Sequence, residues 1–166
     1  MFGLTIYKIL SFILLPIGAL LGLMGLFGII SGLGNPYLLL IAFITLCTSI
    51  YIFSSFLFVY NSLMRDKQSN PTLKDWIKVN AYVSLFISSS CIIDFVTLKS
   101  KPSLIKDTIN QMMAMKKSFP PEFISMIPQL INFVLYFFLV FGLILFLHIT
   151  YSLTLIKTKR HYFEEF

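Results

Sequence analysis

The sequence predicts an all-α integral membrane protein whose four transmembrane helices form a four-helix bundle, with one amphipathic helix in the outer membrane interface. Composition is the first reason, because 57% of the residues are hydrophobic and only 12% are charged, whereas soluble domains are about 45–50% apolar and about 25% charged. The second reason is that four apolar runs each reach the length of about 20 residues that a helix needs to cross a bilayer. A helix satisfies its own backbone hydrogen bonds in lipid, where water is absent.

We place the four spans near residues 9–31, 37–60, 76–98 and 128–156, and the amphipathic helix near residues 103–117. These segments leave little chain for a soluble domain, so residues 1–166 are expected to form a single membrane domain. The apolar run after Lys8 continues past the length of a signal sequence, and no A-x-A-like cleavage site follows it. This favours a retained span over a cleaved secretory signal.

The first span carries a stripe of small residues. Ser11, Gly18, Gly25 and Gly32 lie seven positions apart, and Gly22 falls between two of them. At helical pitch these residues share one narrow face, on which another helix can approach closely. The stripe predicts either a contact with the third span or an interface with another subunit. The third span offers small residues of its own, which are Ala81, Ser84, Ser88 and Cys91.

The third span is the most polar of the four. We expect it to begin at a capping box, Thr72-Leu-Lys-Asp75, with Thr72 as the cap. Asp94 is the only acidic residue within a span. A pairing with Lys99 near the interface is the favoured interpretation, and a proton or cation relay is the alternative. The polar face of this helix carries Asn80, Ser84, Ser88, Cys91 and Asp94.

Between the third and fourth spans, one segment is apolar on a single side. Its apolar residues recur at helical spacing and are Leu104, Ile105, Ile109, Met112, Met113 and Met115. This pattern predicts a helix lying flat in the interface with its apolar face toward the lipid. The methionine thioethers could instead hold Cu(I), but no histidine or cysteine accompanies them. We therefore expect no metal site.

The fourth span is expected to have Pro128 in or near its first turn. Asn132 and Tyr136 share one side of this helix, and His148 points nearly the opposite way. A buried imidazole can relay protons or ligate haem, but the other histidine, His161, lies in the tail. We therefore expect no cofactor, and a His148 that bonds to a neighbouring helix or, through water, to a lipid headgroup.

Lysine and arginine residues orient the chain. Eight of them lie on the side that holds both termini, and five lie on the other side. Because basic residues are enriched in cytoplasmic loops, both termini are predicted to be cytoplasmic in a membrane such as a bacterial inner membrane. This flanking charge explains the net charge of +6. The aromatic residues lie in the spans and not among the basic residues, so nucleic-acid binding is not expected.

No part of the sequence has the spacing of a catalytic or nucleotide-binding motif. G-x-S-x-G and H-E-x-x-H are both absent, and Cys47 and Cys91 lie inside apolar runs. We therefore expect a protein that is not an enzyme but a structural or accessory subunit of a larger membrane complex, in contact with lipid and other membrane subunits. The alternative is a small channel or carrier working as a homo-oligomer, with a pathway lined by Asn80, Ser84, Ser88, Asp94, Asn132 and Tyr136.

Overall fold

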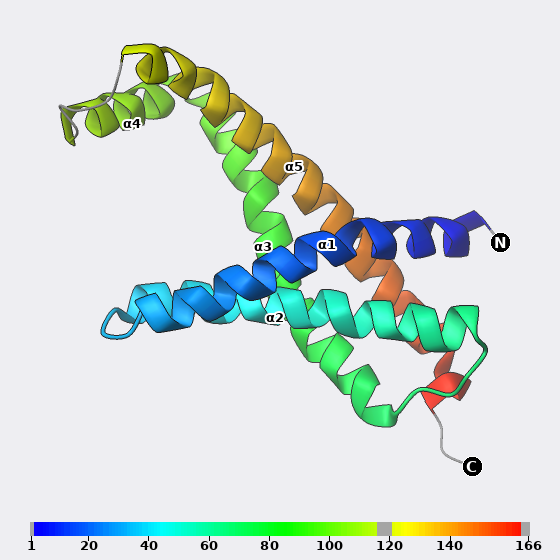
Figure 1. Cartoon of the computed structure of the whole chain (residues 1–166). Helices are drawn as coiled ribbons and strands as arrows, with labels where there is room; N and C mark the ends of the chain where they lie inside the picture. Colours follow the sequence, from blue (N-terminus) through cyan, green and yellow to red (C-terminus); the bar gives the residue numbers. More distant parts are fainter. Residues whose placement is uncertain (1, 116–120, 164–166) are drawn as a thin grey trace. The chain divides into compact units, whose positions relative to one another are not determined.

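The computed structural model describes residues 2–115 and 121–163, which are helical apart from short connections. The elements are α1 (Phe2–Ser31), α2 (Pro36–Phe58), α3 (Pro71–Ser100), α4 (Pro102–Met115) and α5 (Pro121–Thr158), with a π-helical segment η1 (Val59–Met64) and a 3-10 turn η2 (Arg160–Phe163) (Figure 1). Four stretches of the described chain are long and apolar enough to cross a membrane: Gly3–Ser31, Pro36–Met64, Pro71–Ser100 and Met126–Thr158. The predicted all-α membrane fold is confirmed.

Three helices begin several residues earlier than the predicted spans, and the first of them is α1, which begins at Phe2 and not near residue 9. α3 begins at Pro71, and its cap is Asn70 and not Thr72, because the Asn70 side chain accepts a hydrogen bond from the Thr72 N–H at 2.8 Å. Proline at the first helical position has a helical φ and no N–H to satisfy, which makes Asn-Pro a strong start signal. α5 begins at Pro121 and not near Pro128. Hydropathy marks where a bilayer core would begin, whereas the helix itself extends beyond that core.

A tight turn joins α1 to α2. Gly34 has a φ of +93°, a left-handed conformation that glycine adopts without strain. Asn35 then caps α2, because its side-chain oxygen accepts hydrogen bonds from the N–H groups of Tyr37 at 3.1 Å and Leu38 at 3.4 Å. The turn returns α2 antiparallel to α1 and beside it (Figure 1).

The chain divides into two compact units. The first unit contains residues 1–87 and 144–166, and the second contains residues 88–143, so α3 and α5 contribute to both. In the first unit, α1 and α2 pack with the first part of α3 and the last part of α5 as a bundle of four helical segments. The single domain predicted for residues 1–166 stays a prediction.

In the first unit, the glycines of the small-residue stripe pack against α2, whereas Ser11 of the stripe contacts His148 of α5. A Cβ atom added at Gly18 would lie 2.7 Å from Ile52 Cγ2, and one added at Gly25 would lie 2.6 Å from Leu46 Cγ. The stripe therefore contacts α2 and not the third span, because the short turn at Gly34 holds α1 and α2 together. Gly22 and Gly28 of α1 also face α2, and Gly32, in the turn after α1, lies against Leu38 and Leu39 at the start of α2.

The outer surfaces of the candidate spans are apolar. Large side chains such as Phe27, Ile30 and Phe133 are 68%, 68% and 69% exposed. Soluble monomers rarely leave extended apolar surface uncovered, whereas a bilayer covers such surface with acyl chains. The candidate spans therefore imply contact with lipid, and the chain is a multi-pass membrane protein.

In the second unit, the last part of α3 packs against the first part of α5. A Cβ atom added at Gly142 would lie 3.0 Å from the Cys91 Cβ and 3.0 Å from the Ser88 carbonyl oxygen. The small residues Ser88 and Cys91 therefore face Gly142 of α5, not the stripe of α1. As in many membrane proteins, small residues allow two helix backbones to approach closely.

Helix α4 coincides with most of the predicted amphipathic segment at residues 103–117. Helix α4 runs from Pro102 to Met115. Leu104 is 41% exposed and Ile105 is half-buried. The side chains of Ile109, Met112, Met113 and Met115 lie outside the described part of the chain. The lipid-facing role of this helix therefore stays a prediction.

Candidate functional site

Three helices of the first unit meet at a buried polar cluster centred on His148. We call it the histidine cluster, and its members are Tyr7 and Ser11 from α1, Tyr51 from α2, and His148 and Ser152 from α5. Ser11 Oγ lies 2.7 Å from His148 Nε2, and the Tyr51 hydroxyl lies 2.8 Å from His148 Nδ1. Each member is at most 1% exposed. The cluster is therefore sealed from both water and lipid.

Both ring nitrogens of His148 have a hydroxyl partner on another helix. Ser11 Oγ lies within hydrogen-bonding distance of His148 Nε2 at 2.7 Å and of the Tyr7 carbonyl oxygen at 2.9 Å, so it joins the imidazole to the backbone of α1. On the other side of the ring, the Tyr51 hydroxyl of α2 lies next to Nδ1. The imidazole thus uses both of its nitrogens to bond to neighbouring helices.

Aromatic contacts fix the orientation of the His148 ring. The Tyr7 ring stacks on it with centroids 4.6 Å apart and an interplanar angle of 16°. The Tyr51 ring meets it edge-on at 5.7 Å and 74°. The Tyr7 hydroxyl reaches past the imidazole to Ser152 Oγ at 2.9 Å. The cluster thus ties α1 and α2 to α5 through hydrogen bonds and ring packing together.

The chain end of the first unit is held against the loop between η1 and α3. The Ser69 N–H donates to the Tyr162 carbonyl oxygen at 2.8 Å, and the Tyr162 hydroxyl donates to Asp66 Oδ1 at 2.5 Å. The Phe163 ring stacks on Phe58 at 5.0 Å and is 4% exposed. The hydrogen bond to the Asp66 carboxylate raises the pKa of the Tyr162 phenol, with smaller contributions from burial and from the charge of Asp66. These contacts hold η2, and with it Arg160, beside the start of α3.

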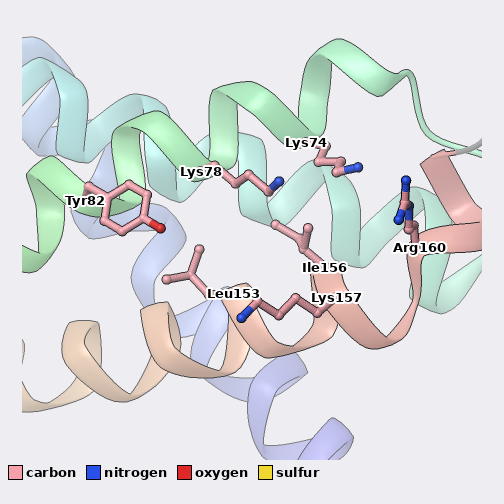
Figure 2. A pocket seen from close by; sticks show the side chains of 7 residues that line it. All are labelled: Lys74, Lys78, Tyr82, Leu153, Ile156, Lys157 and Arg160. Carbon is pink, nitrogen blue, oxygen red and sulfur yellow. The ribbon is translucent and has the colours of Figure 1, made fainter.

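A groove of about 470 Å³ lies between the start of α3 and the end of α5. We call it the basic groove (Figure 2). Positions 74, 78 and 82 share one face of α3 at helical spacing, and positions 153, 157 and 160 continue one face of α5 into η2. Because these two faces oppose each other, the groove gathers cations from segments far apart in the sequence. It is lined by Lys74, Lys78, Tyr82, Leu153, Ile156, Lys157 and Arg160.

The lining of the basic groove changes along its length. Lys74 and Arg160 lie at one end, and Tyr82 and Leu153 lie at the other (Figure 2). The charged end coincides with the ends of two candidate spans, and the other end lies further inside them. Lys74 and Lys78 are half-buried, so their methylene stems cover apolar surface while their ammonium groups face the groove.

The polar residues predicted for the third span bond mostly within their own helix. The Asn80 amide donates to the Trp76 carbonyl oxygen at 2.8 Å, and the Ser84 hydroxyl donates to the Asn80 carbonyl oxygen at 2.7 Å. Asn80, Ala81 and Ser84 are buried in the first unit. These bonds satisfy polar groups locally and leave apolar surface toward neighbouring helices.

In the second unit, Lys99 has a different partner from the one expected. Its ammonium donates to Asn132 Oδ1 at 2.9 Å and lies 4.8 Å from the centroid of the Tyr136 ring. The expected ion pair between Lys99 and Asp94 is therefore replaced by an amide and a cation–π contact. Asp94 is exposed and lines a cleft of about 300 Å³ with Cys91, Phe95, Leu98, Leu135 and Phe138.

Sequence reasoning singled out His148 and Ser11 but missed the rest of both sites. Tyr7 and Ser11, like His148 and Ser152, are polar pairs four residues apart inside apolar spans, and such pairs share a helix face. Lys74 and Lys78 repeat the same spacing at the start of α3. These pairs could have indicated two functional faces. They could not have indicated which faces meet, because that depends on how the helices pack.

Within residues 2–115 and 121–163, the side chains of His, Cys, Asp and Glu form no group of three that could hold a metal ion. The two cysteines, Cys47 and Cys91, are free thiols. The sites of the described chain are therefore built from hydrogen-bonding and basic groups. Comparison of this chain with known protein families, with curated protein sequences and with solved structures finds no match.

Proposed function

We propose that this multi-pass membrane protein is a non-catalytic, accessory subunit of a larger membrane protein complex. The observation that supports the proposal is the complete burial of the histidine cluster. Ser11 and His148 lie as close as a nucleophile and its general base would. Each member of the cluster, however, is at most 1% exposed, so the pair is closed to a substrate. Both imidazole nitrogens bond to side chains of other helices, and the arrangement joins those helices.

Complete internal bonding of the polar groups also supports a scaffold role. Throughout the part of the chain that the structure describes, each buried side-chain nitrogen or oxygen has a hydrogen-bond partner. Enzymes and carriers need polar groups whose bonding capacity is available to a substrate or ion. Here that capacity is used within and between helices, which stabilises a defined arrangement of apolar surfaces.

The apolar surface of α1 offers room for a membrane-embedded partner. One side of this helix packs on α2 through the glycines, while Leu20, Met24 and Phe27 on other sides are 62%, 66% and 68% exposed. A surface of this kind accepts either acyl chains or the apolar side of another transmembrane helix. The protein thus has packing surface to offer a complex.

The subunit proposal predicts stable association with other chains. Extraction in a mild detergent, followed by affinity capture and size-exclusion chromatography, should recover the tagged chain together with unrelated membrane proteins at a fixed stoichiometry. An unrelated four-span protein carrying the same tag, expressed at the same level, controls for detergent carry-over. Mass spectrometry of the peak identifies the partners.

A channel or carrier would behave differently in the same experiment. It would elute alone or as a homo-oligomer and would move solute or ions after reconstitution into liposomes. Recovery of such an active homo-oligomer would replace the subunit proposal with the alternative. The residues to substitute first would then be Asn80, Ser84, Ser88, Asp94, Asn132 and Tyr136.

The charge distribution predicts which side of the membrane each loop occupies. In a background without Cys47 and Cys91, a Gln111→Cys variant should react with an impermeant maleimide added to intact cells, because Gln111 is exposed on α4. A Lys67→Cys variant, in the exposed loop before α3, should react only after the membrane is permeabilised. The opposite labelling pattern would show that both termini lie outside.

A further inference from the structure

We propose that the basic groove binds the phosphate of an anionic membrane lipid, with the start of its acyl region lying along Leu153 and Ile156. The proposal does not depend on whether the protein is an accessory subunit. It rests on the charge of the groove, on how that charge is graded along its length, and on the location of the groove at the ends of two candidate spans.

The first argument is the local charge. Three lysines and one arginine line a single groove of about 470 Å³. Lys74 and Lys78 are also four residues apart on one helix, an arrangement in which like charges repel and destabilise the helix. An anion bound between the two ammonium groups attracts both of them and so offsets their mutual repulsion. A phosphate suits the groove, because ammonium groups and a guanidinium are the groups that proteins use to bind it.

The second argument is the gradient from charged to apolar lining. From Lys74 to Tyr82 the α3 helix advances by about 12 Å, at about 1.5 Å per residue. On the opposite wall, the chain passes from Arg160 in η2 through Lys157 to Leu153 in α5 over a similar length. The residues of both walls therefore change from basic to aromatic or apolar in the same direction, while the Lys157 side chain extends toward Leu153 (Figure 2). A lipid has this order of groups from phosphate to acyl chain, whereas a free phosphate would use only the charged end.

The third argument is that the groove is preorganised. Ile156 in its lining is 2% exposed, so the apolar part is held by the core of the first unit. The bonds from η2 to Ser69 and Asp66 keep the chain that carries Arg160 beside α3. A site that is already formed loses little conformational entropy when its ligand binds.

The predicted topology places the basic groove in the leaflet that contains anionic lipids. Both termini and the start of α3 are predicted to lie on the cytoplasmic side, where anionic lipids give the leaflet a negative surface potential. Basic pockets between transmembrane helices on that side suit anionic lipid headgroups. Phosphatidylglycerol, which carries one phosphate diester, is the probe that we choose.

The test measures phosphatidylglycerol binding to the full-length protein in detergent by native mass spectrometry. The wild-type chain should retain one phosphatidylglycerol in preference to phosphatidylcholine. A Lys78→Gln/Lys157→Gln variant should bind it about 25-fold more weakly, because each basic side chain at a membrane surface contributes about a fivefold factor. Binding to the wild type should also weaken as salt rises.

Matched variants separate a site from general attraction between charges. A Lys8→Gln/Lys67→Gln variant loses the same charge outside the groove and should bind like the wild type, and a Lys78→Arg/Lys157→Arg variant should retain binding. Equal binding by the Lys78→Gln/Lys157→Gln variant and the wild type would overturn the proposal. So would protection from thermal unfolding by inorganic phosphate equal to that by phosphatidylglycerol, because the groove would then be a site for soluble anions. Thermal unfolding of each variant verifies that it is folded.

Discussion

A Gly18→Leu variant should unfold at a clearly lower temperature than the wild-type protein, with a loss of about 3 kcal/mol or more in the free energy of unfolding. The physical reason is overpacking, which costs about 1–3 kcal/mol in a well-packed core and occasionally more. A Cβ atom at Gly18 would already lie 2.7 Å from Ile52 Cγ2, before the rest of the leucine side chain is placed. Separating the helices would also break the 2.8 Å hydrogen bond from Ser49 Oγ to the Gly18 carbonyl oxygen.

The neighbouring residue provides a matched control. Ala19 is exposed on the same turn of α1, so an Ala19→Leu variant adds a similar amount of side chain on a side that does not face α2. In a Cys91→Ser background, unfolding can be followed with a maleimide dye that reacts with Cys47, which is 7% exposed in the folded protein. If Gly18→Leu and Ala19→Leu unfold at the same temperature, the glycines are not the contact that holds α1 to α2.

A His148→Ala variant should lose about 3 kcal/mol of the free energy of unfolding. Truncating a large buried side chain leaves a cavity, and large-to-small core substitutions cost about 2–5 kcal/mol. The variant also removes the hydrogen bond between the Tyr51 hydroxyl and Nδ1, and such a bond contributes about 0.5–1.5 kcal/mol. Water that enters the cavity recovers part of the lost free energy of unfolding. The expected total is therefore near the lower end of the sum of the two costs.

The residue before His148 controls for its truncation. Leu147 is 53% exposed on the same helix, so Leu147→Ala should change the unfolding temperature little. A double-mutant cycle of His148→Ala with Tyr51→Phe isolates their hydrogen bond, for which about 0.6 kcal/mol is typical between transmembrane helices. A His148→Ala variant as stable as Leu147→Ala would mean that the histidine cluster does not hold the three helices together.

These two predictions concern different contacts of one structure. The glycines join α1 to α2 along most of their length, whereas the histidine cluster joins that pair to α5 at a single level. Loss of the first contact should separate neighbouring helices, and loss of the second should free α5 from the pair. The accessory-subunit proposal requires both, because a partner protein recognises a fixed arrangement of helices.

Sequence alone was sufficient to predict the class of fold. The four spans follow from hydropathy and length, which are properties of each segment, and the helical state follows because a segment in lipid must satisfy its own backbone. The glycine face of α1 was predictable for the same reason, since residues seven apart in one helix share a side. The starts of α1 and α5 were misplaced because apolar composition indicates the bilayer core and not the end of the helix. The cap of α3 was misplaced because Thr72 was preferred to Asn70 before Pro71.

Only the tertiary structure decided which faces meet. His148 is separated from Ser11 by 137 positions and from Tyr51 by 97, and no periodicity within one helix relates such residues. The same holds for the stripe, which packs on α2 and not on α3, and for Lys78 and Lys157 on opposite walls of the basic groove. The physical reason is that helical pitch sets the direction of a side chain relative to its own axis. The neighbours of that side chain depend on how whole helices rotate and pair. That packing is determined by the side chains of all the helices together.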